Sequence, residues 1–455
     1  MVGRGFDLTP CGRLAECSRR YAKFSSAQKR RSQGVDMDIR EQMVEMGKRA
    51  KAAARRLSSA SGRAKQDALL ILADMLESES EAIARANRLD LDAAAGRGLD
   101  KARVQRLTIS GKVLKSMIQG CREVAAMADP VGEIESMTKR PNGMLVGRMR
   151  VPLGVVAMIY ESRPNATVDA GILCLKAGNA VILRGGSEAF HSNRCLADLM
   201  HKALRRAGLP EDAVQVPPTT DREAVAEMLK LEEYIDVVIP RGGEGLIRAV
   251  TGQATMPVLK HYKGVCQIFA DASCDVARAV DIIENAKMQY PSGCNAMECL
   301  LVHEDVAGAL LPKVAAAIGP KGVRFKACAA SLPLLGEYAE PAADEDWGYE
   351  FLDLVMAVKV VADMDEAMDY IAEYGSNHTE SILSEDYANC MRFIREVDAS
   401  LVVANATTRF NDGGQLGLGA EIGISTSKLH AYGPMGIKEL TSAKFVLLGD
   451  GQIRE

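Results

Sequence analysis

The sequence lacks the features by which several classes of protein are identified. Its 11 cysteines and 6 histidines are scattered, with no CxxC pair and no Cys/His cluster at zinc spacing, so no metal site is expected. No apolar run reaches the length of a membrane span. The formal net charge is only −4 and the pI is near 6.0. Because no stretch interleaves basic residues with aromatics, nucleic acid is not an expected partner.

The composition is that of an ordinary soluble globular protein. Hydrophobic residues make up 47% and charged residues 25% of the 455 positions, as in most folded domains. A chain of this length predicts two or three domains with an ample core. An odd number of cysteines without a disulfide framework favours reduced thiols, so we expect a cytoplasmic location.

Residues 1–36 differ in composition from the rest of the chain. They are rich in arginine, lysine and serine and contain few acids. An organellar transit peptide is one interpretation, but Asp7 and Glu16 interrupt the basic run and no amphipathic period is evident. We therefore favour a disordered leader, or an upstream start that precedes an initiator at Met37.

The hydrophobic pattern predicts an α/β fold. Residues 37–127 carry apolar side chains at the spacing of helices, and Ser78 with Glu81 has the form of a capping box that starts a new helix. From Gly154, short strand-like runs alternate with helix-like runs, and a second series of this kind extends over 267–404. Such alternation predicts right-handed crossovers, so we expect two parallel-sheet α/β domains.

Residues 131–150 predict an exposed β-hairpin. Pro141, Asn142 and Gly143 lie between two extended polar runs, and Asn-Gly is a strong signal for a tight hairpin turn. Unpaired strand edges tend to find a partner in another chain. The hairpin is therefore a candidate oligomer contact.

Cys294 is the strongest candidate for a catalytic residue. It follows the turn-forming Pro-Ser-Gly segment at 291–293, between a helix-like run at 276–288 and a strand-like run at 299–303. A thiol at such a junction can face a cleft, where nearby main-chain N–H groups can stabilise a developing oxyanion. The alternative is that this cysteine is a small buried hydrophobic residue, as most single cysteines are.

Two glycine-rich turns at expected strand ends are candidates for nucleotide binding. Arg184 is followed by Gly185 and Gly186, and Arg241, shortly after a later strand-like run, is followed by Gly242 and Gly243. Glycines let a ligand approach the main chain, the following helix N-terminus favours phosphate, and arginine suits a ribose 2′-phosphate. Either turn alone is an ordinary strand-to-helix connection, whereas two in one sheet favour a nucleotide cleft.

The motifs around these candidates form a series along the chain. Val-Pro-Leu-Gly-Val-Val occupies 151–156, Tyr-Glu-Ser-Arg-Pro-Asn 160–165 and Lys-Ala-Gly-Asn-Ala-Val-Ile-Leu 176–183. The remaining motifs are at 183–186, 259–264, 289–299, 350–354, 405–410, 412–415, 417–421 and 428–431. In this order they resemble the aldehyde dehydrogenase superfamily and, within it, the γ-glutamyl phosphate reductases. The similarity runs from about residue 37 to the C-terminus.

The resemblance implies how the chain is divided. A cofactor-binding domain would comprise 37–130 and 151–265, and a catalytic domain with the thiol would comprise 266–435. Residues 131–150 and 436–455 would form an oligomerisation flap, in which the C-terminal strand returns to the hairpin. A homo-oligomer is therefore expected.

The resemblance also implies an activity, the NADPH-dependent reduction of γ-glutamyl phosphate to glutamate 5-semialdehyde and phosphate in proline biosynthesis. Cys294 would carry the glutamyl group as a thioester. Its main-chain N–H would share the oxyanion hole with Arg163 or Asn165, and spacing leaves both open. Because this small-molecule substrate is labile, glutamate 5-kinase, which makes it, is a candidate partner.

The same resemblance suggests further cofactor and substrate residues. Arg184 is the leading candidate for the NADP 2′-phosphate and Glu350 for the nicotinamide ribose, with both glycine-rich turns close to the phosphates. Hydrolytic aldehyde dehydrogenases carry a glutamate in the segment corresponding to 260–264, where this chain has no carboxylate. Residues expected at the substrate end are Lys260, His261, Lys263, Arg409, Asp412, Gly413 and Gln415.

Two other functions are compatible with the sequence. Another aldehyde dehydrogenase or a coenzyme A-acylating reductase would share most of the motifs, although the absent glutamate argues against the hydrolytic type. A non-catalytic scaffold of the same fold would usually have lost its thiol, and Cys294 is present.

Overall fold

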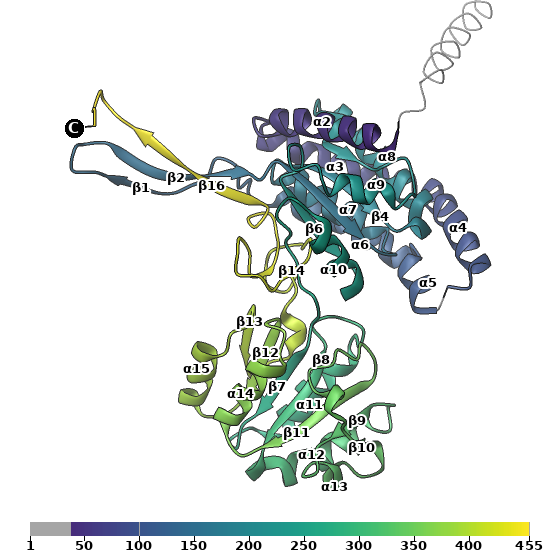
Figure 1. Ribbon diagram of the computed structural model, residues 1–455, viewed down its shortest axis with the longest axis vertical. Coiled ribbons are helices and arrows are strands. Elements are labelled where there is room, and N and C mark those ends of the chain that lie inside the picture. The colour runs from purple at the N-terminus through teal and green to yellow at the C-terminus, as the bar shows by residue number, and fades with distance from the viewer. Residues whose placement is uncertain (1–37, 100, 455) are drawn as a thin grey trace, which may run out of the picture.

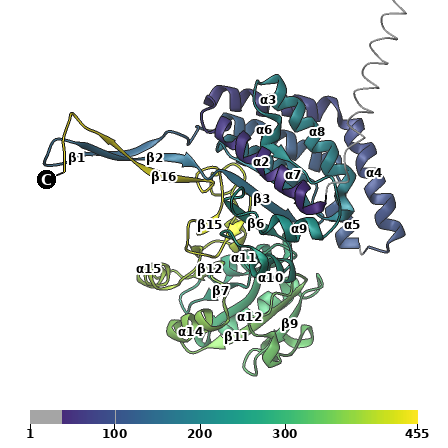
Figure 2. The same cartoon turned by 45° about the horizontal axis from the view of Figure 1, so that its top comes forward.

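The computed structural model describes residues 38–99 and 101–454, so the expected leader at 1–36 lies outside the described residues. A group of helices precedes the first sheet and packs around it (Figures 1 and 2). None of the helices in the described part of the chain is long and apolar enough to cross a membrane. The first helices are α2 (Ile39–Leu57), α3 (Gly62–Ser78), α4 (Ser80–Gly96), α5 (Lys101–Leu107) and α6 (Gly111–Ala126).

The start of α4 corrects one detail of the sequence interpretation. A helix does begin after Ser78, but the predicted capping box does not form, because Ser78 is the last residue of α3. Its hydroxyl donates to the carbonyl of Met75 in its own helix, at 3.4 Å. Glu79 is the N-cap of α4 and makes no side-chain capping bond.

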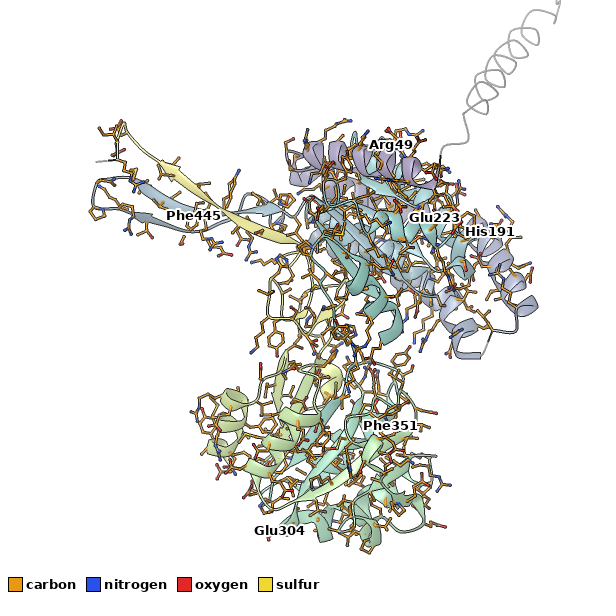
Figure 3. All side chains as sticks on the ribbon, viewed as in Figure 1. Arg49, His191, Glu223, Glu304, Phe351 and Phe445 are labelled. Carbon is orange, nitrogen blue, oxygen red and sulfur yellow. The ribbon has the colours of Figure 1, made fainter. Side chains whose placement is uncertain are left out.

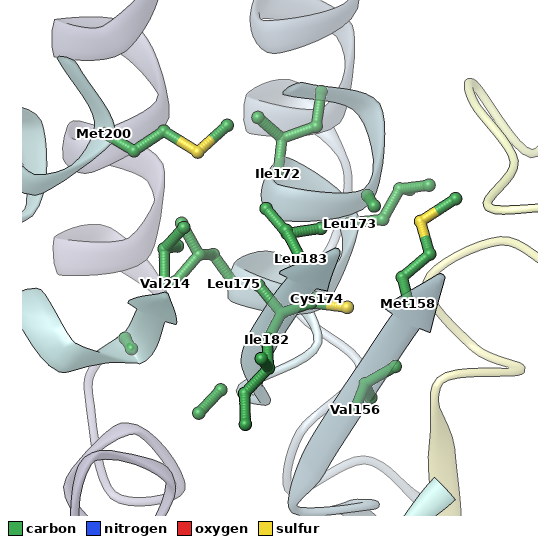
Figure 4. Close-up of a cluster of buried hydrophobic side chains, with 14 of the residues drawn as sticks. Val156, Met158, Ile172, Leu173, Cys174, Leu175, Ile182, Leu183, Met200 and Val214 are labelled. Carbon is green, nitrogen blue, oxygen red and sulfur yellow. The ribbon is translucent and has the colours of Figure 1, made fainter. Parts of the chain in front are cut away.

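The first domain is built on a four-stranded parallel sheet in the order β5-β4-β3-β6. Every residue of β3 and β4 is buried, which explains their uninterrupted apolar runs. Figure 4 shows Val156 of β3, Ile182 of β4, Leu173 of α7 and Met200 of α8 in one cluster of buried side chains. The strands are β3 (Val155–Tyr160), β4 (Ala180–Gly185), β5 (Val214–Gln215) and β6 (Val237–Arg241), and the helices are α7 (Asn165–Lys176), α8 (Phe190–Arg206), α9 (Glu223–Met228) and α10 (Glu244–Gln253).

The second domain has a seven-stranded parallel sheet in the order β10-β9-β11-β8-β7-β12-β13. Neighbouring residues belong to different apolar clusters, Ile268 and Leu300 to one and Phe269 and Leu301 to the other. The sheet is therefore covered on both faces, and the predicted parallel α/β organisation is confirmed for both domains. The strands are β7 (Cys266–Ala270), β8 (Met297–His303), β9 (Arg324–Ala327), β10 (Ala339–Pro341), β11 (Val355–Val361), β12 (Thr379–Leu383) and β13 (Leu401–Ala404). The helices are α11 (Val276–Met288), α12 (Glu304–Ile318), α13 (Leu332–Leu335), α14 (Met364–Tyr374) and α15 (Tyr387–Glu396).

The predicted hairpin is confirmed as well. β1 (Ile134–Lys139) pairs antiparallel with β2 (Leu145–Pro152), and Gly143 in the turn adopts a φ of +90°. β16 (Thr441–Leu448) returns and pairs antiparallel with the whole of β2. We call these three strands the flap. It projects from the first domain in Figure 1, and Figure 3 shows Phe445 on it.

Before it reaches the flap, the chain contributes again to the first domain. β14 (Ile424–Ser425) and β15 (Gly433–Pro434) form a short antiparallel pair. Ile422 and Met435 are buried in the core of the first domain, whereas the sequence interpretation placed residues up to 435 in the catalytic domain. Leu440, from the segment assigned to the flap, is buried in the same core. Isolated apolar residues in a loop-rich segment have no periodicity, so the pattern alone does not indicate which core they join.

Candidate active site

A cleft of about 740 Å³ is lined by both domains. The first domain contributes the segments that follow β3, β4 and β6, which are carboxyl ends of parallel strands, where α/β proteins bind their ligands. The second domain contributes the loop between α11 and β8. The expected site residues that line the cleft are Arg163, Asn165, Arg184, Gly185, Gly186, Gly242, Gly243, His261, Lys263, Cys294, Glu350, Arg409 and Asp412.

Cys294 lies on a tight loop between the end of α11 and the start of β8. Gly293 N–H donates to the carbonyl of Tyr290 at 3.0 Å, and Ala296 N–H donates to the carbonyl of Gly293 at 2.9 Å. The Cys294 side chain is partly exposed. Among the described residues, its main-chain N–H has no acceptor, so this group is free to bind an oxyanion.

The loop is held by side chains on two sides. The buried amide of Asn295 donates to the carbonyl of Asn411 at 2.9 Å, and the Thr408 hydroxyl donates to the carbonyl of Asn295 at 2.7 Å. The buried thiol of Cys266 donates to the carbonyl of Cys294 at 3.2 Å. Burial raises the pKa of Cys266 well above its usual value, so this thiol stays a neutral donor with a structural role.

Gly264 and Glu350 support the same carbonyl from another direction. The Cys294 carbonyl lies so close to Gly264 that an added Cβ would overlap it. Glu350 accepts a hydrogen bond from the Gly264 N–H at 2.9 Å, and burial raises the pKa of Glu350. Glu350 therefore reaches the cleft beside the thiol loop, while its expected contact with a nicotinamide ribose stays a prediction.

Arginines from both domains surround the thiol loop. The guanidinium carbon of Arg409 lies 5.7 Å from the centre of the Tyr290 ring. Burial lowers the pKa of Arg409, and Cys294 opposes that shift. In the first domain, desolvation in the cleft and the neighbouring Arg241 lower the pKa of Arg163. Because their surroundings disfavour these positive charges, the cleft is well suited to an anionic ligand.

Arg163 and Asn165 both reach the cleft near the start of α7. Asn165 donates one amide hydrogen to Asp169 at 3.0 Å, and burial raises the pKa of Asp169 to about 6. Among residues 38–99 and 101–454, no acceptor is bound to the second amide hydrogen of Asn165 or to the guanidinium of Arg163, so both are available to an oxyanion. The choice between them therefore stays open.

The two glycine-rich turns face the cleft, and each lies beside a carboxylate. After β4, a Cβ on Gly186 would overlap Glu188, which accepts hydrogen bonds from the main-chain N–H and the hydroxyl of Ser162 at 2.8 and 2.5 Å. At the start of α10, Glu161 accepts a hydrogen bond from the Gly243 N–H at 3.1 Å. A Cβ on Gly242 would likewise overlap the side chains of Glu161 and Leu246, so side chains pack closely against both turns.

Arg184 makes contacts other than those expected of it. Its buried guanidinium donates to the carbonyl of Gly185, to that of Thr220 at 2.9 Å and to that of Asp221 at 3.3 Å. These bonds tie the end of β4 to the loop at 217–222. These bonds leave few donors of Arg184 for a 2′-phosphate and so do not favour the predicted contact with NADP. That contact stays a prediction.

Three expected substrate residues, Lys260, Gly413 and Gln415, do not line the cleft. The ammonium of Lys260 lies 4.9 Å from the centre of the Tyr262 ring. The main-chain N–H of Gln415 donates to Asp412 at 3.2 Å. Gln415 thus contributes to the turn that holds Asp412.

Sequence reasoning missed several arginines that line the cleft. Arg241 is not one of them, because it is the cation of the second glycine-rich turn, at the end of β6 directly before Gly242. Arg106 on α5 and Arg222 before α9 carry no motif, and only the fold brings them to the cleft. Within residues 38–99 and 101–454, no group of three or more His, Cys, Asp or Glu side chains is arranged to hold a metal ion.

Comparison with known proteins identifies the family of this chain. Residues 15–324 match the aldehyde dehydrogenase family. The γ-glutamyl phosphate reductase of Maridesulfovibrio salexigens is 63% identical over 418 residues, and that of Oleidesulfovibrio alaskensis is 61% identical over 419 residues. Each alignment covers 92% of this chain and all of the relative.

Solved structures agree with the sequence relatives. The γ-glutamyl phosphate reductase of Thermotoga maritima has a TM-score of 0.88 and 44% identity, over 91% of this chain and 100% of that one. An acetylating aldehyde dehydrogenase from Geobacillus thermoglucosidasius, 20% identical with a TM-score of 0.68, covers 92% of this chain and 99% of its own and shares the fold. The chain belongs to the aldehyde dehydrogenase family and, within it, to the γ-glutamyl phosphate reductases, which are oxidoreductases.

Proposed function

We propose that this chain reduces γ-glutamyl phosphate with NADPH, through a thioester on Cys294, and thereby supplies glutamate 5-semialdehyde for proline biosynthesis. The observation that carries this proposal is the position of Cys294. Its partly exposed thiol lies on a fixed loop in a cleft lined by two parallel-sheet domains. The names of the relatives at 57–63% identity point to the same substrate.

The thiol loop supplies the nucleophile and one oxyanion donor. The Cys294 thiolate attacks the acyl carbon, and the carbon–oxygen bond to phosphate breaks, leaving a thioester and free phosphate. The oxyanion that develops on the carbonyl is bound by the Cys294 N–H and by Arg163 or Asn165. When bound, NADPH supplies the hydride that reduces the thioester. Breakage of the carbon–sulfur bond then releases the aldehyde and restores the thiolate.

The residues of the cleft fit a dinucleotide cofactor. Glycines lie at the carboxyl ends of β4 and β6, next to the starts of helices that follow in the chain. Their lack of side chains allows a phosphate group to approach the main chain. Glu350 lies near the thiol loop, where the nicotinamide ribose would be, and donors for the phosphates come from the turns.

The arginines suit the substrate. γ-Glutamyl phosphate carries a phosphate at one end and a carboxylate at the other, and both anions are bound well by guanidinium groups. Arg163 and Arg241 line the cleft from the first domain and Arg409 from the second. The segment 260–264 offers no carboxylate to activate water, so the thioester is protected from hydrolysis.

The test is an assay of the reverse reaction. Wild-type protein with glutamate 5-semialdehyde, phosphate and NADP should produce NADPH, measured by absorbance, only when phosphate is present. Cys294→Ala should lower the rate by at least about 1,000-fold while leaving the Kd for NADPH nearly unchanged. Cys195→Ala, at another partly exposed cysteine outside the cleft, is the matched control. Full activity of Cys294→Ala, or a requirement for coenzyme A in place of phosphate, would contradict the proposal.

We also propose a cytoplasmic homo-oligomer that receives its substrate from glutamate 5-kinase. The flap supports the first part, because Phe445 is 72% exposed, Leu447 55% and Leu448 59% on the single strand β16. Apolar side chains gathered on a projecting sheet favour pairing with another chain.

A further inference from the structure

The side chain expected to meet a cofactor 2′-phosphate is already occupied. The guanidinium of Arg184 is directed at three main-chain carbonyls, those of Gly185, Thr220 and Asp221. Its relative exposure is only 9%, and within the described part of the chain its Nε is buried without a partner. Two of the three guanidinium nitrogens, Nη1 and Nη2, are already engaged at the end of β4. Arg184 therefore has the contacts of a residue that positions a loop.

The loop held by Arg184 carries another arginine. Inside the loop, Asp221 N–H donates to the Thr219 hydroxyl at 3.1 Å, and Glu223 N–H donates to the Asp221 carboxylate at 2.9 Å. Arg222 lies between these fixed residues, beside Glu223, which is labelled in Figure 3. The conformation of the main chain at Arg222 is thus defined from both sides.

Arg222 itself is free to bind a ligand. It is exposed and lines the same cleft as Cys294. Among the described residues, its guanidinium has no hydrogen-bond or ion-pair partner. The carboxylate of Glu188, which lines the same cleft, accepts hydrogen bonds from Ser162. A planar guanidinium binds phosphate oxygens in a bidentate manner.

The place of Arg222 in the fold fits the adenosine end of a dinucleotide. The nicotinamide must lie near Cys294, where the reaction takes place. In the sheet order β5-β4-β3-β6, the loop of Arg222 follows the outer strand β5, and the adjoining β4 ends at Gly185, directly before Gly186. A cofactor that extends from Cys294 across these glycines therefore brings its adenosine ribose to Arg222.

We propose that Arg222 pairs with the ribose 2′-phosphate and selects NADPH over NADH, and that Arg184 positions Arg222 through the loop at 217–222. The inference rests on the proposed use of a nicotinamide dinucleotide. It replaces Arg184 by Arg222 as the residue that determines cofactor specificity.

The test measures binding and therefore does not depend on turnover. NADPH, NADH, 2′-AMP and 5′-AMP are titrated into the full-length protein, with fluorescence for the dinucleotides and calorimetry for the nucleotides. Arg222→Ala should raise the Kd for NADPH and for 2′-AMP about 10- to 100-fold, and change the Kd for NADH and for 5′-AMP less than about 2-fold. Arg206→Ala, at an exposed arginine on α8 outside the cleft, should change none of these four Kd values.

The role of Arg184 is tested by combining substitutions. Arg184→Ala should reduce NADPH selectivity in the wild-type background and cause no further selective loss in the Arg222→Ala background. An added loss in the double variant would show that Arg184 itself contacts the phosphate and would overturn its positioning role. Unchanged NADPH selectivity in Arg222→Ala and in Arg222→Gln would overturn the proposal for Arg222. Selective binding without reductase turnover would instead refute the proposed function and leave this inference standing.

Discussion

Glu350 accepts a hydrogen bond from the main-chain N–H of Gly264 at 2.9 Å, and Gly264 in turn packs directly against the carbonyl of Cys294. A carboxylate on one loop thus helps to set the position of the nucleophile on another. Cys266 donates to the same carbonyl at 3.2 Å. Because this carbonyl is supported on both sides, the orientation of the thiol depends on residues that do not react.

Gly264→Ala should impair catalysis more than folding. The new methyl group would overlap the Cys294 carbonyl, so the thiol loop must move. A displacement near 1 Å costs about 100-fold in rate, and we expect a loss of kcat of this size with NADPH affinity retained. Steady-state kinetics and the rate of iodoacetamide labelling of Cys294 measure the effect. Gly308→Ala, where the added methyl meets open space, is the control. Wild-type kinetics for Gly264→Ala would contradict the tight packing at the thiol loop.

The buried ion pair of Lys287 and Glu298 should stabilise the catalytic domain only as a pair. The two side chains are fully buried and 2.7 Å apart, and Glu298 also accepts the Leu352 N–H at 3.1 Å. Lys287→Met or Glu298→Leu alone should lower the free energy of unfolding by about 3–5 kcal/mol, because one charge is left buried and unpaired. The double variant should recover most of this loss in urea unfolding. Additive losses in the double variant would argue against the pair as the source of the effect.

His378 should make the protein less stable in acid. The ring is fully buried, and burial lowers its pKa from 6.5 to about 4. As the pH falls below 6.5, the imidazole of His378 becomes protonated in the unfolded chain but stays neutral in the folded chain. The stability present above pH 6.5 is therefore lost progressively toward pH 4. This amounts to about 2 kcal/mol between pH 7.5 and 5. Urea unfolding at the two pH values should show this loss in wild type and a smaller one in His378→Phe. Equal losses would place the acid sensitivity elsewhere.

The flap should control the oligomeric state. Phe445 and Leu447 are exposed and, two residues apart on β16, point to the same face. Changing both to lysine should reduce the size of the assembly, since burial of two charged side chains at a contact is unfavourable. Light scattering coupled to gel filtration measures the mass. Ser442→Lys, at an exposed polar position of the same strand, should leave the mass unchanged. An unaltered mass in the double lysine variant would exclude this face as the contact.

Much of the fold was predictable because it depends on local pattern. The run at 276–288 coincides with α11, and the Asn142-Gly143 signal marks the turn of the flap. Helical and strand periodicities are properties of neighbouring residues, so they survive without tertiary information. The capping box at Ser78 failed for a local reason, since the preceding helix continues through that residue.

The sequence by itself determined that this is a parallel-sheet α/β protein with Cys294 as its candidate nucleophile, because periodicity and motifs are encoded locally. Tertiary structure alone decided which arginines face the cleft. Arg222 has no motif around it, yet the fold brings it to the cleft that Cys294 lines. Arg184 has the motif, yet its guanidinium is directed at Thr220, 36 residues away along the chain. Hydrogen bonds between distant segments decide where a long flexible side chain points, and no pattern of neighbouring residues contains that information.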